Sequence, residues 1–156
     1  MKNHLHFENY VKENWVDYNG HMNDSAYARI FSLAVEDFMD VVGLGLEARL
    51  KTSRTIYTLE NHICYLKEAY EGQRLHIIPQ LLDKDLKRLH IFFTMENDKG
   101  DILATSEQML ISVHMVERRP VPFPDDVLSK IEEVWEVHRH LEIPEQVGRK
   151  IEIKRK

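Results

Sequence analysis

The hydrophobic positions of this chain follow a helical period near the N-terminus and then change to alternation. From Ser25 to Val42, apolar residues recur every three or four positions, as on the buried face of an amphipathic helix. These residues are Ala26, Ile30, Leu33, Ala34, Phe38, Val41 and Val42. We expect Asn23 or Asp24 to cap this helix, and Gly43 and Gly45 to end it. Its length and apolar face predict packing against a sheet.

Extended segments surround this helix. One strand is predicted before it, over Leu5–Val16. Four strands are predicted after it, over Thr55–Leu66, Arg74–Leu82, Arg88–Glu96 and Ile102–Val116. The short polar turns at Glu71–Gly72 and Asn97–Gly100 favour antiparallel hairpins. Three prolines in Arg119–Pro124 end the last strand, and a second amphipathic helix is predicted over Asp125–His140.

This order predicts an α+β fold. A curved antiparallel five-stranded sheet would wrap around one long central helix, with a C-terminal helix beside it. Residues 1–156 are expected to form a single domain. Such a sheet leaves edge strands to protect, and pairing of two copies would protect them. We therefore expect a homodimer or a homotetramer.

Composition narrows the possible partners and the location. The net charge is −5, no apolar run could span a bilayer, and the N-terminus lacks the apolar core of a signal peptide. A cytoplasmic protein that binds neither nucleic acid nor membrane is therefore expected. The single cysteine, Cys64, excludes an internal disulfide and is expected to be buried. No metal site is predicted, because the histidines are scattered: His4, His6, His76, His90, His114, His138 and His140.

The turn before the long helix carries the candidate chemistry. Residues 15–27 read WVDYNGHMNDSAY, which places the Asp17 carboxylate just ahead of the helix start. The first backbone N–H groups of a helix have no partner within it, and they can stabilise a developing negative charge. A carboxylate beside such donors suits acyl transfer or hydrolysis. An aspartate at this position also suits an Asx turn, so both roles remain open.

The segment VDYNGHMN, followed by AY and an amphipathic helix, resembles the hotdog-fold acyl-CoA thioesterases of the 4-hydroxybenzoyl-CoA thioesterase class. The segments HICYLKEAYEGQRL and ERRPVPFPDDV extend this resemblance over most of the chain. HMNDSAYARIFSLA and HICYLKEA look closest to thioesterases associated with carnitine breakdown, which resemble betainyl-CoA thioesterases and are sometimes fused to carnitine dehydrogenase. The sequence has no G-x-G-x-x-G stretch to carry a dehydrogenase domain.

The resemblance implies hydrolysis of a small acyl-CoA thioester to a free acid and CoA, without a metal or redox cofactor. Asp17 matches the catalytic acid, acting either as nucleophile or as base on water. The backbone N–H near Asp24 matches the oxyanion position, and Gly20 would permit the tight turn. His21 is either a donor to the substrate or a structural partner, and Asn23 either a helix cap or a substrate contact.

Further candidates follow from side-chain chemistry. Glu60 and His62 share one face of their strand, where they would either reach a site between subunits or face solvent. Four aromatic residues would either hold a trimethylammonium group or pack in the core: Trp15, Tyr18, Tyr27 and Tyr65. Three basic residues are candidates for the CoA phosphates, or else belong to a solvated surface: Lys67, Arg118 and Arg119.

Two alternative functions remain from the sequence. One is an acyl-CoA dehydratase on the same fold, although the aspartate-first motif differs from the usual hydratase arrangement. The other is a non-catalytic acyl-CoA binding protein, against which the intact Asp17 and its glycine turn argue. Release of free thiol from acyl-CoA would distinguish hydrolysis from both.

Overall fold

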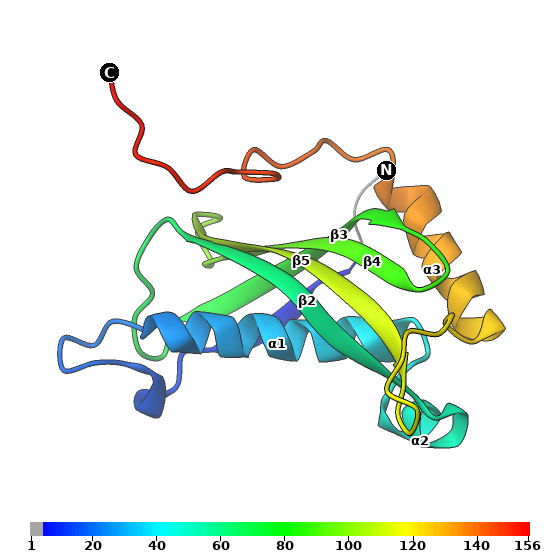
Figure 1. Ribbon diagram of the computed structural model, residues 1–156. Coiled ribbons are helices and arrows are strands. Elements are labelled where there is room, and N and C mark those ends of the chain that lie inside the picture. Colours follow the sequence, from blue (N-terminus) through cyan, green and yellow to red (C-terminus); the bar gives the residue numbers. More distant parts are fainter. Residues whose placement is uncertain (1–4) are drawn as a thin grey trace.

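A five-stranded antiparallel sheet curves around one long helix in the computed structural model, which describes residues 5–156 (Figure 1). The helix is α1 (Asp24–Val41). The strands are β1 (Phe7–Tyr10), β2 (Arg54–Tyr65), β3 (Arg74–Lys84), β4 (Arg88–Glu96) and β5 (Ile102–His114). They lie in the order β1-β3-β4-β5-β2. The predicted sheet wrapped around a central helix is confirmed.

The core lies between α1 and the concave face of the sheet. On the helix, Phe31 and Phe38 are fully buried, and Phe31 meets Phe93 of β4 with ring centroids 6.3 Å apart. The helical spacing of apolar residues explains the burial of these side chains, because it places them on the one face of α1 that the sheet covers. The prediction of this helix is right to within one residue at either end.

The predicted strand over Leu5–Val16 is wrong beyond Tyr10. β1 ends there, and Glu13–Trp15 form a short 3-10 helix, in which the Trp15 N–H donates to the Lys12 carbonyl. The consecutive polar residues after Val11 interrupt the alternation that a half-buried strand requires. The chain therefore turns away from the sheet before it reaches α1.

A second helix, α2 (Leu46–Thr52), was not predicted. Gly43 ends α1 as expected, with φ of +87°, but Gly45 instead precedes α2 as its N-cap. The seven residues of α2 bury none of their side chains completely, so no strong hydrophobic period marks them in the sequence. Three predicted C-terminal ends also differ by two residues, since β3 continues to Lys84, β5 stops at His114, and the last helix, α3 (Asp125–His138), stops at His138.

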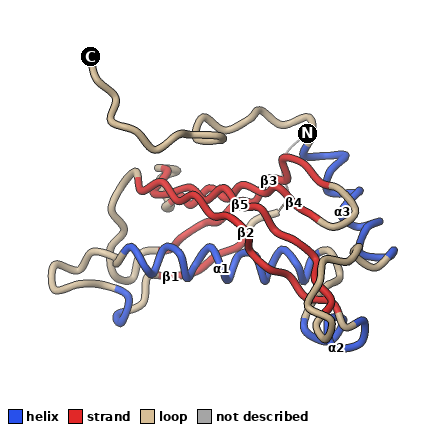
Figure 2. The backbone as a smooth tube through the Cα atoms, viewed as in Figure 1, coloured by secondary structure: helices blue, strands red, loops and turns tan. Residues whose placement is uncertain are grey.

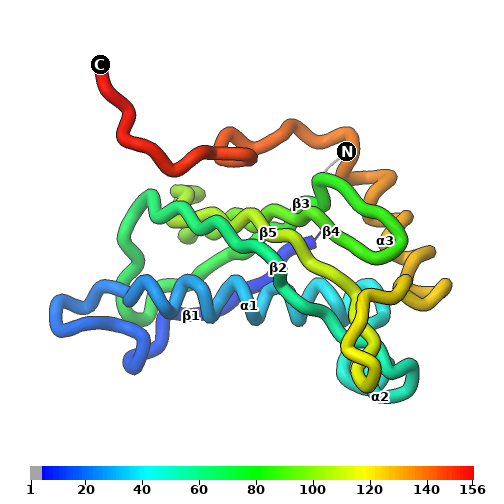
Figure 3. The backbone as a smooth tube through the Cα atoms, viewed as in Figure 1, coloured from blue at the N-terminus to red at the C-terminus, as the bar shows by residue number. Residues whose placement is uncertain are grey.

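α3 and the C-terminal segment both contact the sheet. α3 lies against β3, where the Leu81 N–H donates to His138 Nδ1 at 2.8 Å. Figure 2 shows the C-terminal segment as a loop on the side of the sheet opposite α1, and Figure 3 follows it to the chain end. The Gly148 N–H anchors it to the Glu107 carboxylate of β5 at 2.7 Å. Among the described residues, no helix is long and apolar enough to cross a membrane.

Candidate active site

The turn that precedes α1 is built around Asp17. Its Oδ1 accepts the backbone N–H groups of Asn19 at 2.9 Å and of His21 at 3.1 Å. The Asp17 and His21 backbones also bond to each other at 2.9 Å, which closes the turn. Gly20 has φ of +77°, a conformation that residues with a Cβ rarely adopt. The carboxylate thus makes the contacts of an Asx turn, and in the single chain it stays exposed.

His21 links this turn to the segment between β2 and β3. Its Nδ1 lies 3.2 Å from a carboxylate oxygen of Glu68, and its ring meets the Tyr70 ring edge-on at 5.0 Å. The His21 and Tyr70 backbones also form an isolated antiparallel bridge. These contacts match the structural role that the sequence left open for this histidine.

The first turn of α1 leaves a backbone donor available. Asn23 occupies the N-cap position, as predicted, but its side chain makes no capping bond. The Asp24 side chain instead accepts the Ser25 N–H at 2.9 Å. Within residues 5–156, the backbone N–H of Asp24 has no hydrogen-bond acceptor. A free N–H at a helix start, with the helix dipole behind it, can stabilise an oxyanion.

A cavity of about 280 Å³ opens beside this helix start. Its lining is aromatic, apolar and charged: Met22, Asp24, Tyr27, Tyr65, Leu66, Lys67 and Glu68. The rings of Tyr27 and Tyr65 are perpendicular, with centroids 5.2 Å apart, and the Tyr65 hydroxyl donates to the Asp24 carbonyl at 3.4 Å. Burial, and then the charge of Asp24, raises the pKa of Tyr65. Aromatic faces and carboxylates together suit a cationic group.

Tyr27 fixes the wall of this cavity. Its hydroxyl accepts the Ala69 N–H at 3.1 Å and donates to the Lys67 carbonyl at 3.3 Å. The side chain is 4% exposed, and its burial raises the pKa of the phenol. A buried hydroxyl with both bonds made holds the segment from Lys67 to Ala69 in one position.

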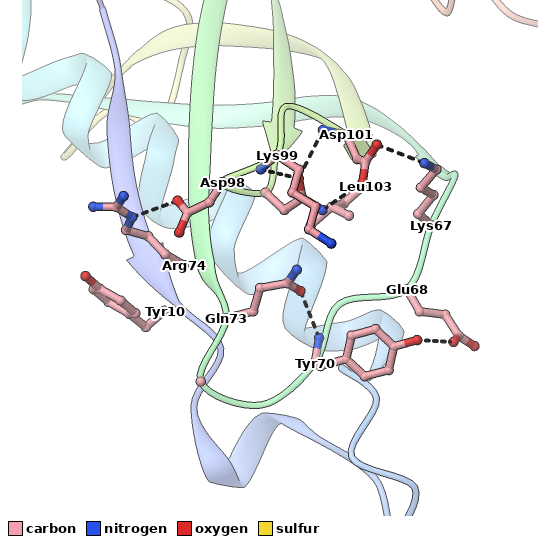
Figure 4. Close-up of a pocket in the computed structure, with 12 residues that line it drawn as sticks. Tyr10, Lys67, Glu68, Tyr70, Gln73, Arg74, Asp98, Lys99, Asp101 and Leu103 are labelled. Carbon is pink, nitrogen blue, oxygen red and sulfur yellow. Dashed lines mark hydrogen bonds and ion pairs between the residues drawn. The ribbon is translucent and has the colours of Figure 1, made fainter.

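A larger cavity of about 870 Å³ adjoins the first (Figure 4). Lys67 and Glu68 line both cavities, so this segment borders each of them. Lys67 Nζ pairs with Asp101 at 3.0 Å, and Arg74 Nε pairs with Asp98 at 2.8 Å. Hydrogen bonds from Asn97 and then from Lys67 lower the pKa of Asp101. Arg74 and Lys99 were not predicted, because only the tertiary structure brings them beside Lys67.

Comparison with known proteins decides the family. A model of the Thioesterase-like superfamily matches residues 11–131. The chain belongs to this superfamily. It is 42% identical over 146 residues to a Pseudomonas aeruginosa betainyl-CoA thioesterase, covering 93% of this chain and 92% of that protein. The predicted hotdog-fold thioesterase is therefore confirmed.

Two further relatives of this thioesterase are informative. A Rhizobium meliloti L-carnitine dehydrogenase/betainyl-CoA thioesterase is 39% identical over 147 residues, which are 93% of this chain but 29% of that longer protein. A Staphylococcus aureus hypothetical protein, solved in complex with CoA, superimposes with a TM-score of 0.91 at 33% identity, covering 96% of this chain and 94% of that one.

The other candidate residues of this thioesterase lie away from the helix start. Glu60 and His62 line a separate cavity of about 730 Å³, whose lining also includes residues of β4, β5 and the C-terminal segment around Gly148. Arg118 and Arg119 belong to the segment that follows β5, and Figure 1 shows this segment beside α2. Arg119 pairs with Glu117. In one protomer, neither these four residues nor Asp17 lines the cavity beside Asp24.

Two predicted aromatic residues flank the Asp17 turn. Trp15 is half-buried against the core, and the Lys12 ammonium lies 4.6 Å from its ring centroid. Tyr18 projects from the turn and is 97% exposed. Trp15 therefore serves packing, whereas Tyr18 is available for contact with another molecule. Cys64 is buried as predicted, with its sulfur 3.7 Å from His62 Nε2.

Proposed function

We propose that this protein hydrolyses betainyl-CoA to glycine betaine and free CoA. Both curated relatives reported above carry betainyl-CoA thioesterase in their names. The small cavity at the start of α1 supports the same substrate, because Tyr27 and Tyr65 offer aromatic faces and Asp24 and Glu68 offer negative charge. Each good contact between a quaternary ammonium and an aromatic ring contributes about 0.5–2 kcal/mol.

The backbone N–H of Asp24, which has no acceptor among the described residues, is the observation that carries the catalytic proposal. A thioester carbonyl placed in this cavity would direct its oxygen at that donor. Loss of one such donor typically costs about 3 kcal/mol of transition-state stabilisation. Because the donor belongs to the backbone, substitution of the Asp24 side chain need not remove it.

Asp17 supplies the second catalytic element in this proposal. It either attacks the thioester carbonyl directly or removes a proton from the attacking water. In both cases the carbon–sulfur bond breaks, one water molecule is consumed, and the CoA sulfur leaves as a thiolate that takes up a proton. The proposed reaction requires no metal or redox cofactor.

The proposed active unit is a homodimer paired along β2. This strand is an edge of the sheet, and it exposes Tyr57 and Leu59 by 47% and 54%. Exposed apolar edge strands are normally covered by another chain or element. A homotetramer would add a second contact between two such dimers.

This pairing also gives Arg118 and Arg119 a role. β2 runs from Arg54, whose guanidinium bonds to the carbonyl of Pro122, to Tyr65 beside Asp24. Two-fold pairing makes the two β2 strands antiparallel, so the arginine end of one protomer approaches the helix start of its partner. We propose that these arginines and Lys67 bind the CoA phosphates.

A matched pair of substrates tests the proposal. In 3,3-dimethylbutyryl-CoA, carbon replaces the quaternary nitrogen of betainyl-CoA, so shape is kept and charge is lost. Thiol release measured with a chromogenic disulfide should give a kcat/KM at least about tenfold higher for betainyl-CoA, consistent with two cation–aromatic contacts. Equal rates would exclude the cation site, and no thiol release from any short aliphatic, aromatic or betainyl ester would exclude hydrolysis itself. The cytoplasmic location and the absence of a nucleic-acid partner stay predictions.

A further inference from the structure

Three potential metal ligands meet where the N-terminal segment joins the sheet. Glu8 of β1 lies directly opposite His76 of β3 in the ladder, and His6 precedes Glu8 by two residues. His6 Nε2 lies 2.7 Å from His76 Nδ1 and 4.0 Å from Glu8 Oε1, which is 3.7 Å from His76 Nδ1. The expectation that the histidines are scattered is therefore wrong for His6 and His76, which are far apart only in sequence.

A fourth residue orients His76. Asp98, in the turn between β4 and β5, lies 2.6 Å from His76 Nε2. The same oxygen of Asp98 accepts the Arg74 Nε–H at 2.8 Å, so it faces two donors. The proton of His76 therefore belongs on Nε2, and its Nδ1 presents a lone pair toward His6 and Glu8. A carboxylate behind a histidine is the usual support of a metal-binding imidazole.

We propose that His6, Glu8 and His76 bind a divalent transition-metal ion of the zinc class. Nitrogen and oxygen ligands at about 2.0–2.2 Å from zinc lie about 3.3 Å apart in a tetrahedron. The three separations of this cluster bracket that value, and an ion would open the short His6–His76 contact slightly. Two imidazoles and one carboxylate favour zinc, nickel or copper over magnesium or calcium.

The surroundings leave room for an ion and for water. His6 and His76 line a cavity of about 400 Å³ that also contains Glu96 and Asn97. The His76 side chain is 17% exposed, whereas His6 and Glu8 are 43% and 44% exposed, so an ion can enter from solvent. The fourth position of the ion would face this cavity, where a water molecule can bind.

The ion would fasten His6 and β1 to β3. β1 has four residues and pairs with β3 along one side, so few backbone bonds hold it. An ion that binds the folded chain and not the unfolded one raises stability by mass action. None of His6, Glu8 and His76 lines the cavity at the start of α1, and the test does not depend on catalytic activity.

A matched histidine–carboxylate pair provides the control. His90 Nε2 lies 2.7 Å from Glu107 Oε2 on the neighbouring strands β4 and β5. Within residues 5–156, the cluster at His6 is the group of three side chains that meets the distance requirement for a metal ion. His90→Ala should therefore leave zinc binding unchanged. Cys64→Ser should also leave it unchanged, which excludes the buried thiol as a ligand.

The test uses the untagged full chain and zinc alone. Calorimetric titration should show saturable binding of one zinc ion per chain, and zinc should raise the melting temperature. His76→Ala and Glu8→Gln should each weaken binding about tenfold or more. Asp98→Asn should weaken binding about 10–100-fold, because Asp98 orients the ligand His76. Circular dichroism checks that each variant is folded.

Spectroscopy adds a readout that nonspecific binding would not give. Cobalt bound in place of zinc should show the visible absorption of a tetrahedral nitrogen–oxygen site, and this absorption should disappear in Glu8→Gln, which retains its size. The proposal is overturned if the full chain binds no zinc saturably. It is equally overturned if folded His76→Ala and Glu8→Gln bind zinc as tightly as the unmodified chain.

Discussion

The carboxylate of Asp17 accepts the backbone N–H of His21 at 3.1 Å, so the proposed catalytic group also holds its own turn. Asp17→Asn separates these functions, because an amide oxygen can still accept both N–H groups but can act neither as nucleophile nor as base. We expect normal folding and a loss of turnover of about 100-fold or more, measured by thiol release.

Asp17→Ala is the matched comparison, because it removes the acceptor as well as the charge. It should lose both turnover and some thermal stability, as expected when a turn loses its side-chain bonds. Activity retained in a folded Asp17→Asn protein would refute the catalytic role.

The buried hydroxyl of Tyr27 gives a prediction about stability. Tyr27→Phe leaves the Ala69 N–H without its acceptor in the core, which should cost about 1–3 kcal/mol of unfolding free energy. Urea denaturation measures this loss. Tyr65→Phe is the control, since Tyr65 is 52% exposed and water can replace its bond to the Asp24 carbonyl. Equal losses in the two variants would contradict the role given to the Tyr27 hydroxyl.

The exposed edge of β2 gives a prediction about assembly. Leu59→Lys places a charge on this edge and should convert the proposed dimer to monomers, because a buried unpaired ammonium opposes pairing. Light scattering coupled to gel filtration would detect the change in mass. Leu50→Lys adds the same charge on α2, where Leu50 is 65% exposed, and should leave the mass unchanged. A dimer that survives Leu59→Lys would place the interface elsewhere.

The buried imidazole of His138 makes stability depend on pH. Burial lowers the pKa of His138 from its ordinary value of 6.5 to about 4, so the unfolded chain binds a proton more readily than the folded one. The neutral imidazole makes its full contribution to the free energy of unfolding above pH 6.5. This contribution is lost as the pH falls from 6.5 toward 4, by up to about 3 kcal/mol.

A non-titrating variant isolates this effect. In His138→Asn, the amide oxygen can accept the Leu81 N–H but takes up no proton in this range. Urea unfolding from pH 7 to pH 4 should therefore show a smaller loss of stability than in the unmodified chain. His140→Asn, at an exposed position beyond α3, should behave like the unmodified chain. An unchanged pH profile in His138→Asn would contradict the prediction.

Local patterns explain where the sequence predictions succeeded. The apolar period of α1 and the alternation of β4 are properties of consecutive residues, so both elements were located almost to the residue. Failures occurred where a local pattern was weak. The polar run after Val11 hides a 3-10 helix, and α2 has no residue that is completely buried.

The sequence alone determined the strand–helix–strand order, the curved sheet around α1 and the family motif around Asp17. The tertiary structure alone decided which distant side chains meet, because pairing between strands far apart in the chain depends on register and sheet curvature. Within residues 5–156, it left the Asp24 N–H without an acceptor beside Tyr65, placed Arg74 and Lys99 near Lys67, and brought His6 to His76. No spacing along the chain encodes these contacts, since each depends on the packing of the whole sheet.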